Sequence, residues 1–365
     1  MEIGKFAFCI HPIVYEDITR KYPLLGKLPK SIMNRVLQRV PPSEVSHITG
    51  VSSQHGAAEG WFVGLPLVTQ QMIQLPEQFV LNKIIQAGKR AESLGAKIFG
   101  LGAFTSVIGD GGITVSKNLK IAVTTGNSYT IATAMEAVEE ACKIMDRNIR
   151  DCNAVVIGAT GSIGRVCGLL MAVKADTLTI VAPREEKLER TAEEIVRLTN
   201  KSVKTHTDIR CALQDADVVI TVSSAVDSII KPEYLKTGAI VCDVARPRDI
   251  SVEVSDKRKD VLVIEGGVVE VPGDVNFNFN FGFPPKLSYA CMAETMILAM
   301  EGKYEDYSIG KQLSLEKVME ISRLAAKHGF KLAGFRSFER VIKNEYFISI
   351  KENINKASCV QNSKV

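Results

Sequence analysis

The chain has 365 residues, 46% of them hydrophobic and 24% charged, and this globular composition excludes a wholly disordered protein. Its net charge of +4 is too small to predict nucleic-acid binding, which needs a concentrated basic face. The sequence has no apolar run that would span a bilayer, no signal peptide and no metal-binding Cys or His spacing, so we expect a cytoplasmic protein with reduced cysteines and no metal.

Residues 1–145 are predicted to form a domain that binds the substrate. Prolines between residues 13 and 60 break any long element there. Apolar residues at steps of three and four predict a helix from Gln78 to Leu94. The chain is then strand-like and glycine-rich at 98–125, and helical from about Ser128 to Met145.

The section at 146–285 alternates buried strands with helices. Its strands are expected at 153–157, 177–182, 217–222, 239–243 and 261–264. This alternation predicts an α/β fold with a doubly wound parallel sheet of the Rossmann type. The substrate-binding domain, also α/β, is expected to combine the N-terminal part with C-terminal helices at 286–335, and a basic, irregular tail is expected at 336–365.

A glycine-rich loop follows the first of these strands and opens a helix. Glycines at such a turn let a pyrophosphate approach the backbone N–H groups at the positive end of the helix. The strand, turn and helix context makes the pattern specific for a dinucleotide. The predicted cofactor-binding residues are Gly158, Ala159, Thr160, Gly161, Ser162, Ile163 and Gly164.

The end of the second strand indicates which dinucleotide binds. The strand ends at Pro183-Arg184, where an NAD-preferring site usually has an acidic residue. An arginine at this place pairs with a 2′-phosphate through its planar, charged fork, which favours NADP(H). The alternative is that Arg184 is a solvated charge and that Glu185 or Glu186 binds the ribose.

Cys291 has the most suggestive setting of the eight cysteines. With Ser288 as a predicted N-cap, it lies in the first turn of a helix, where a thiol pKa is lowered. The alternative is a small buried cysteine that only packs. The segment upstream of Cys291 alternates phenylalanine with other residues, at Phe277, Phe279, Phe281 and Phe283. In an extended segment these four rings would face one side. They would then line an apolar channel or form the buried face of an ordinary half-buried strand.

Several stretches of the chain carry a resemblance to a known family. They are Leu101–Ser106, Thr124–Asn127, Val156–Gly164, Gly266–Glu270, Ala290–Glu294 with Glu301 and Gly302, and His328–Phe330. In this order they resemble the cyanobacterial long-chain acyl-[acyl-carrier-protein] reductases. That family reduces fatty acyl thioesters to aldehydes with NADPH through a cysteine acyl-enzyme.

The resemblance implies roles for individual residues. The family's nucleophile falls on Cys291, and its histidines in the first domain look similar to His11 and His55. His55 is the candidate general acid for the aldehyde oxygen, although a structural histidine is the commoner case. The arginine after the second strand is displaced by one position, and the Phe-rich segment and the tail depart from the family.

The predicted function is NADPH-dependent reduction of an acyl thioester to an aldehyde, with acyl carrier protein or coenzyme A as the thiol carrier. One alternative is a dehydrogenase of a small hydroxy or amino acid, similar to shikimate dehydrogenase, for which Lys117 could be recruited, although Val115–Asn118 does not resemble that family's lysine motif. Another is a dinucleotide sensor without catalysis. The sequence leaves the acyl chain length and the oligomeric state open.

Two basic clusters are candidate docking surfaces for an acidic carrier protein, although a solvated face is the simpler explanation of each. The first is Lys27, Lys30, Arg35 and Arg39, and the second is Lys331, Arg336, Arg340 and Lys343.

Overall fold

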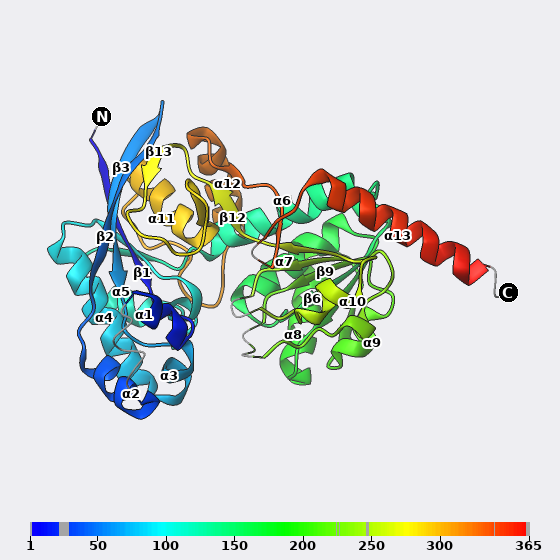
Figure 1. The fold of residues 1–365 in the computed structure, drawn as a ribbon, viewed down its shortest axis with the longest axis horizontal. Coiled ribbons are helices and arrows are strands. Elements are labelled where there is room, and N and C mark those ends of the chain that lie inside the picture. Colours follow the sequence, from blue (N-terminus) through cyan, green and yellow to red (C-terminus); the bar gives the residue numbers. More distant parts are fainter. Residues whose placement is uncertain are drawn as a thin grey trace. The chain divides into compact units, whose positions relative to one another are not determined.

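The structure is a computed structural model that describes residues 2–21, 29–223, 225, 227–245, 248–338 and 340–362. The chain divides into two compact units (Figure 1). Unit 1 consists of residues 1–129 and 269–331, and unit 2 of residues 130–268 and 332–365. The predicted second α/β domain, built from the N-terminal part and C-terminal helices, is confirmed as unit 1. The divisions lie at 129/130 and 268/269, whereas we predicted the Rossmann section at 146–285.

Unit 1 contains a six-stranded sheet in the order β13-β2-β3-β1-β4-β5. Strands β3, β1, β4 and β5 run parallel, and β2 is antiparallel to both β3 and β13. The sheet elements are β1 (Gly4–Ile10), β2 (Ser43–Ser53), β3 (Gly56–Gly64), β4 (Ile98–Gly100), β5 (Ala122–Thr124) and β13 (Gly273–Asn276). The helical elements and β14 are α1 (Tyr15–Lys21), α2 (Lys30–Arg39), α3 (Thr69–Gln74), α4 (Glu77–Ser93), η2 (Ala103–Ser106), α5 (Ile113–Lys117), β14 (Leu287–Tyr289), α11 (Ala290–Met300) and α12 (Leu315–His328).

Helices cover both faces of this sheet. Alternate residues of β1, such as Ala7 and Cys9, pack with the apolar side of α4. The other face carries glycines that let α11 lie directly on the strands. A Cβ atom at Gly4 would lie only 2.0 Å from the Ala299 carbonyl oxygen, and one at Gly100 only 2.2 Å from Thr295 Oγ1. The buried strands therefore fix α11 at a short distance from the sheet.

Two sequence predictions in unit 1 are wrong in detail. The stretch at 98–125 forms two short strands separated by η2 and α5, rather than mainly strand. We predicted no long element between residues 13 and 60 because of its prolines, but this segment contains most of a long antiparallel β2–β3 hairpin.

Unit 2 is a parallel six-stranded sheet in the order β11-β10-β9-β6-β7-β8. This is the doubly wound order, with the first strand at the centre, so the Rossmann prediction is confirmed. Its elements are η3 (Ile149–Asp151), β6 (Asn153–Ile157), α7 (Ser162–Lys174), β7 (Thr177–Val181), α8 (Glu185–Thr199), β8 (Val203–His206), α9 (Ile209–Leu213), β9 (Val218–Thr221), η4 (Pro232–Tyr234), β10 (Ile240–Asp243), α10 (Glu253–Lys257), β11 (Leu262–Glu265), β16 (Arg336–Ser337), β17 (Arg340–Val341) and α13 (Asn344–Asn362). The unit divisions fall inside α6 (Asn127–Ile144), β12 (Val268–Glu270) and β15 (Lys331–Leu332).

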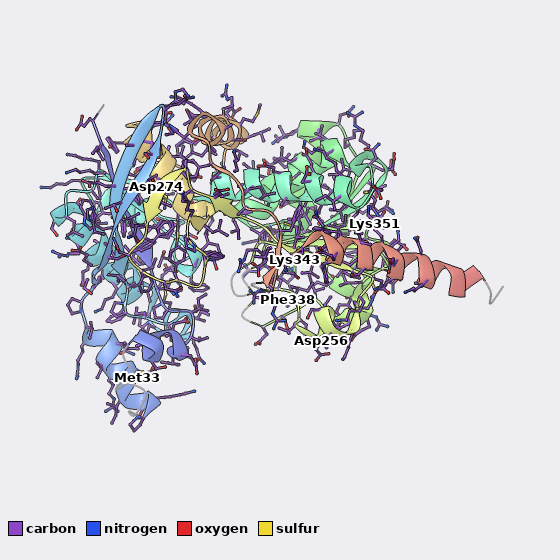
Figure 2. The ribbon with its side chains drawn as sticks, turned by 45° about the horizontal axis from the view of Figure 1, so that its top comes forward. Met33, Asp256, Asp274, Phe338, Lys343 and Lys351 are labelled. Carbon is purple, nitrogen blue, oxygen red and sulfur yellow. The ribbon has the colours of Figure 1, made fainter. Side chains whose placement is uncertain are left out.

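The prediction of an irregular tail is wrong, because residues 344–362 form α13. Its apolar residues Phe347 and Ile350 are buried, and the ring centroids of Phe347 and Phe335 lie 5.7 Å apart. Lys351, labelled in Figure 2, forms an ion pair with Asp146. The tail therefore packs as part of unit 2. Among the described residues, no helix combines the length and the apolar character needed to cross a membrane.

Candidate functional site

Cys291 is the second residue of α11 and is half-buried. The prediction of a first-turn position is confirmed, but the predicted N-cap is wrong. Ser288 lies in β14 and donates its hydroxyl to the Tyr289 carbonyl, while the N-cap is Tyr289, which makes no side-chain cap. The first amides of α11 are thus not satisfied by a capping side chain.

Two loops at the carboxyl ends of β4 and β5 close around Cys291. A Cβ atom at Gly102 would lie 3.5 Å from the Cys291 Sγ, and one at Gly126 would lie 2.2 Å from the Cys291 Cα. Gly126 also has φ of +72°, a conformation that favours glycine. Only glycine fits at position 126, and its backbone packs directly against Cys291.

Burial raises the pKa of the Cys291 thiol to about 12, although hydrogen bonds from the backbone N–H groups of Met292, Cys291 and Ala103 oppose that shift. The expectation of a lowered pKa is therefore wrong, because desolvation outweighs the helix N-terminus. The thiol is protonated in the free protein near neutral pH. The three amides come from two elements, α11 and η2, and sequence analysis identified only those of α11.

His11 holds the loop that carries the Ala103 amide. Its Nε2 accepts the Phe104 N–H at 3.3 Å, and its Nδ1 lies 3.0 Å from the Pro12 carbonyl oxygen, so the neutral Nδ1–H tautomer satisfies both contacts. Burial lowers the pKa of His11, which favours that neutral form. Thr105 fixes the same loop through its hydroxyl and the Gly102 carbonyl, 2.8 Å apart.

The structure does not bring His55 to Cys291. His55 lies in the β2–β3 turn, where its ring centroid is 6.3 Å from that of His328. His328 contacts Ser53 Oγ through Nδ1 at 2.9 Å and Glu301 Oε1 through Nε2 at 2.6 Å. Glu301 is the C-cap of α11, at the opposite end of the helix from Cys291. His55 is therefore no longer a candidate acid for this centre. The hydrogen bonds of His328 instead connect the β2–β3 turn to the C-terminal ends of α11 and α12.

The Phe-rich segment forms a connected cluster of rings that starts in the sheet core. Phe62 of β3 contacts the rings of Phe277, Phe279 and Phe281, with centroids 5.5–6.2 Å apart. Phe281 contacts Phe283 at 5.7 Å, and Phe283 contacts Tyr289 at 4.6 Å. We call these six rings the aromatic cluster. It ends at the N-cap of the helix that carries Cys291, and its outer rings are half-buried.

In unit 2 the glycine loop occupies the place that the sequence predicted. It follows β6 and leads into α7, whose N-cap Gly161 provides no side-chain cap. A Cβ atom at Gly158 would lie 2.9 Å from the Val222 backbone, and one at Gly164 2.2 Å from the Gly158 carbonyl oxygen. The tight turn and the uncapped amides of α7 fit a dinucleotide pyrophosphate.

Arg184 stands at the N-cap of α8, just after β7, and is exposed. A cationic side chain that is open to solvent therefore lies three residues after the end of the second strand. Glu185 and Glu186 follow in the first turn of α8, where acidic residues are favourable in any helix. Their position therefore has an explanation that does not involve a ribose.

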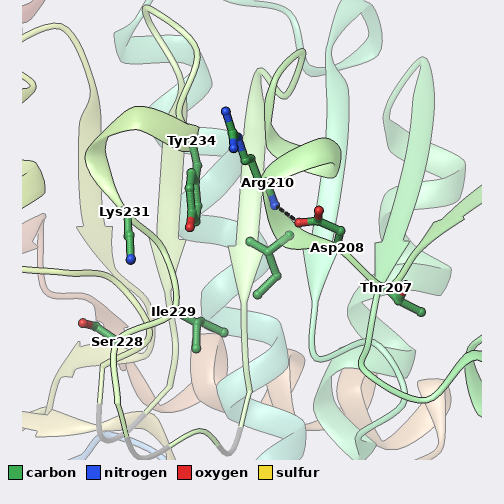
Figure 3. A pocket seen from close by; sticks show the side chains of 8 residues that line it. Thr207, Asp208, Arg210, Ser228, Ile229, Lys231 and Tyr234 are labelled. Carbon is green, nitrogen blue, oxygen red and sulfur yellow. Dashed lines mark hydrogen bonds between the residues drawn. The ribbon is translucent and has the colours of Figure 1, made fainter.

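A separate surface depression of unit 2 lies beside α9 (Figure 3). The Asp208 side chain caps this helix by accepting the Arg210 N–H at 2.8 Å. The depression is lined by Thr207, Asp208, Ile209, Arg210, Ser228, Ile229, Lys231 and Tyr234. It contains none of the site residues that the sequence predicted.

Comparisons with known proteins find relatives over most of the chain. A long-chain acyl-[acyl-carrier-protein] reductase of Synechococcus elongatus (strain ATCC 33912 / PCC 7942 / FACHB-805) is 28% identical over 305 residues, which cover 80% of this chain and 87% of that protein. The predicted resemblance to the long-chain acyl-[acyl-carrier-protein] reductases is confirmed. The aminotransferase PigE of Serratia sp. (strain ATCC 39006) is 29% identical over 311 residues, or 82% of this chain, which spans only 36% of that longer protein.

The nucleotide-binding section has its own match. The model of the shikimate/quinate 5-dehydrogenase family matches residues 139–265. Among solved structures, L-tryptophan dehydrogenase from Nostoc punctiforme is 15% identical, with 97% of this chain and 89% of that chain covered and a TM-score of 0.42. The sequence similarities support an oxidoreductase that uses a nicotinamide cofactor.

Proposed function

We propose that this protein reduces an acyl thioester to an aldehyde with NADPH, through an acyl-enzyme on Cys291. The observation that carries the proposal is the setting of Cys291: a half-buried thiol at the start of α11, with hydrogen bonds from three backbone amides of two elements. A cysteine that only filled space would not need a convergent set of amide donors. The similarity to the acyl-[acyl-carrier-protein] reductases supports the same residue.

The first half of the reaction is an exchange of thioesters. Cys291 Sγ attacks the thioester carbonyl, the bond from the carbonyl carbon to the carrier sulfur breaks, and the thiol proton of Cys291 ends on the carrier thiol. The exchange is neutral overall, but the attacking group is the thiolate, so the Cys291 proton leaves Sγ before or during the attack. The amides of Ala103, Cys291 and Met292 are positioned to stabilise the negative charge that develops during the attack.

The second half replaces the sulfur with hydrogen. A nicotinamide cofactor, when bound, would supply a hydride for the acyl carbon. With one proton from solvent, the carbon–sulfur bond to Cys291 breaks, so that the aldehyde leaves and the thiol is restored. The same amides assist this step because they stabilise the departing thiolate.

For the cofactor we propose that residues 158–164 hold the pyrophosphate at the start of α7. We propose that Arg184 pairs with the 2′-phosphate, which selects NADP(H) over NAD(H). The exposed position of Arg184 directly after β7 supports this assignment.

For the substrate we propose an apolar acyl chain that lies along the aromatic cluster. The cluster reaches Tyr289, two residues before the nucleophile, and Phe281 and Phe283 keep part of their surface accessible. Burial of an alkyl chain against these rings is favourable by about 25 cal/mol per Å² of apolar surface. The carrier is acyl carrier protein or coenzyme A.

The test is the aldehyde yield of Cys291→Ala with an acyl thioester and NADPH. We expect no aldehyde and an unchanged Kd for NADPH, because the glycine loop belongs to unit 2 and Cys291 to unit 1. The matched control is Cys211→Ala, which removes an exposed thiol from unit 2. Substantial aldehyde formation by Cys291→Ala would refute the mechanism.

A second candidate function is a dehydrogenase of a small hydroxy or amino acid, which the dehydrogenase family match at 139–265 favours. That match lies in the nucleotide-binding section. Lys117, the base that this chemistry would use, ends α5 with its side chain exposed. Oxidation of a hydroxy or amino acid that survives Cys291→Ala and disappears with Lys117→Met would support this candidate.

A further inference from the structure

Helix α11 contains a fully buried carboxylate one turn after the proposed nucleophile. Glu294 is 0% exposed and lies three residues after Cys291. Burial of a carboxyl group is costly unless its oxygens are bonded, so its partners indicate what it holds. None of the steps described above uses this residue.

The partners of Glu294 lie in the segment that follows β5. Its Oε1 accepts the Thr124 hydroxyl at 2.5 Å, and its Oε2 accepts the Tyr129 N–H at 2.7 Å. These bonds attach α11 to both ends of the segment 124–129. Hydrogen bonds to a buried carboxylate are among the stronger ones in proteins.

The same segment touches the nucleophile. Thr124 Oγ1 also accepts the N–H of Gly126 at 3.2 Å. Gly126 is the residue whose backbone lies directly against the Cα of Cys291. A continuous set of contacts therefore runs from Glu294 through Thr124 and Gly126 back to Cys291.

We propose that Glu294 is a positioning residue for the nucleophile, which holds the 124–129 segment against Cys291 and fixes the orientation of its side chain. The inference rests on the proposed acyl-enzyme function for its catalytic consequence, but not for its effect on the thiol. Glu294 also raises the pKa of Cys291 through its charge, so its removal affects the thiol directly.

Two variants separate the geometric and the electrostatic effects. Glu294→Gln keeps an oxygen that accepts the Tyr129 N–H and places an NH2 donor against the Thr124 hydroxyl oxygen, with that bond reversed, but it removes the charge. Glu294→Ala removes both the hydrogen bonds and the charge. Glu301→Gln is the matched control, since Glu301 caps the other end of the same helix. Should Glu294→Ala fail to fold, Thr124→Val removes the hydroxyl link, with Thr124→Ser as its conservative partner.

The first measurement is the single-turnover rate of Cys291 acylation by an acyl thioester. We expect Glu294→Ala, or Thr124→Val, to be slower by about tenfold or more, with Glu294→Gln no slower than the wild type, Glu301→Gln close to the wild type and the Kd for NADPH unchanged. Wild-type acylation rates in Glu294→Ala and Thr124→Val would overturn the proposal.

The second measurement is the rate of Cys291 alkylation by iodoacetamide as a function of pH, read by peptide mass spectrometry. We expect the Glu294→Gln profile to move to lower pH, and the Glu301→Gln profile to coincide with that of the wild type. Coincident profiles for Glu294→Gln and the wild type would contradict the effect of the Glu294 charge on the thiol. If wild-type Cys291 accepts no acyl group, the proposed function fails, while this alkylation result still decides the role of Glu294.

Discussion

The thiol of Cys291 combines a protonated resting state with hydrogen bonds that favour its ionised state. Burial is the larger effect and raises the pKa to about 12, while the amides of Met292, Cys291 and Ala103 lower it. Such a cysteine is inert towards adventitious electrophiles near neutral pH and still receives stabilisation when charge develops during attack.

The raised pKa predicts the pH dependence of the free protein. Because the pKa lies above neutrality, the thiolate fraction increases by about tenfold per pH unit between pH 7 and 10, without a plateau. Alkylation of Cys291 by iodoacetamide should follow that slope in a Cys211→Ser background, which removes the exposed competing thiol. A plateau below pH 8 would show that the helix N-terminus controls the thiol instead of its burial.

Arg184 decides the choice of cofactor in the proposed function. Arg184→Ala should raise the KM for NADPH about tenfold to a hundredfold, the effect of losing a charge-assisted contact. The KM for NADH should change little, because NADH has no 2′-phosphate. The measurement is the initial rate against each cofactor, with Arg190→Ala on the exposed side of α8 as the control. An equal loss with both cofactors would contradict the assignment.

Gly126 provides a test of the packing around the nucleophile. Gly126→Ala adds a Cβ atom 2.2 Å from the Cys291 Cα and 2.6 Å from the Cys291 carbonyl oxygen, backbone atoms that cannot move aside as the end of a flexible side chain can. Gly95→Ala is the matched control, because Gly95 also has a positive φ, +90°, but meets no atom within 4 Å. The backbone strain common to both costs about 1–3 kcal/mol. The Tm of Gly126→Ala should fall below that of Gly95→Ala, with loss of acylation only in the former, and equal Tm values would contradict the close contact.

At the scale of elements, the predicted docking surface for an acidic carrier remains a prediction for α2. Its buried residues Met33 (labelled in Figure 2) and Leu37 pack inward with Ile18 and Val68, and its exposed residues include Lys30, Arg35 and Arg39. The fourth residue of this predicted cluster, Lys27, lies outside the described residues. In the second cluster Arg336 is 4% exposed and its Nε lies 3.7 Å from Glu265, so it is not part of a docking surface.

The resulting prediction concerns turnover with acyl carrier protein. Reversal of Lys30, Arg35 and Arg39 to Glu should raise the KM for the carrier-bound substrate by about tenfold or more and weaken its salt dependence. Turnover of the coenzyme A thioester should change much less. The control is the reversal of Lys201 and Lys204, which are exposed in unit 2 and belong to neither cluster. Unchanged kinetics with acyl carrier protein would remove α2 from the docking surface.

The sequence correctly predicted those elements that are determined by residues within the same short segment. The loop at 158–164, α4 and the start of α11 follow from glycine spacing and apolar periodicity within one segment. The amide of Ala103, the contact of Gly126 and the partners of Glu294 could not be predicted in this way. Each depends on segments more than 150 residues apart that the sheet of unit 1 brings together. The predicted N-cap at Ser288 failed for a related reason. Serine is a favourable capping residue, but Ser288 belongs to β14, which pairs with β12 in another segment of the chain.

At the scale of the whole molecule, the proposed reaction divides between the two units. Acylation uses Cys291, the amides around it and the aromatic cluster of unit 1, whereas cofactor binding uses the glycine loop and Arg184 of unit 2. The Rossmann unit alone does not determine a reaction, since the same fold serves many chemistries. The covalent step on unit 1 is therefore the claim that distinguishes an acyl-thioester reductase from any other dehydrogenase.

Intact-protein and peptide mass spectrometry test that claim directly. Purified protein is incubated with a long-chain acyl thioester in the absence of NADPH, and then NADPH is added. The account predicts an acyl adduct on the Cys291 peptide that disappears on addition of NADPH, with release of one aldehyde per adduct. Absence of an adduct, an adduct on another cysteine, or an adduct on Cys291 that NADPH does not discharge would contradict it.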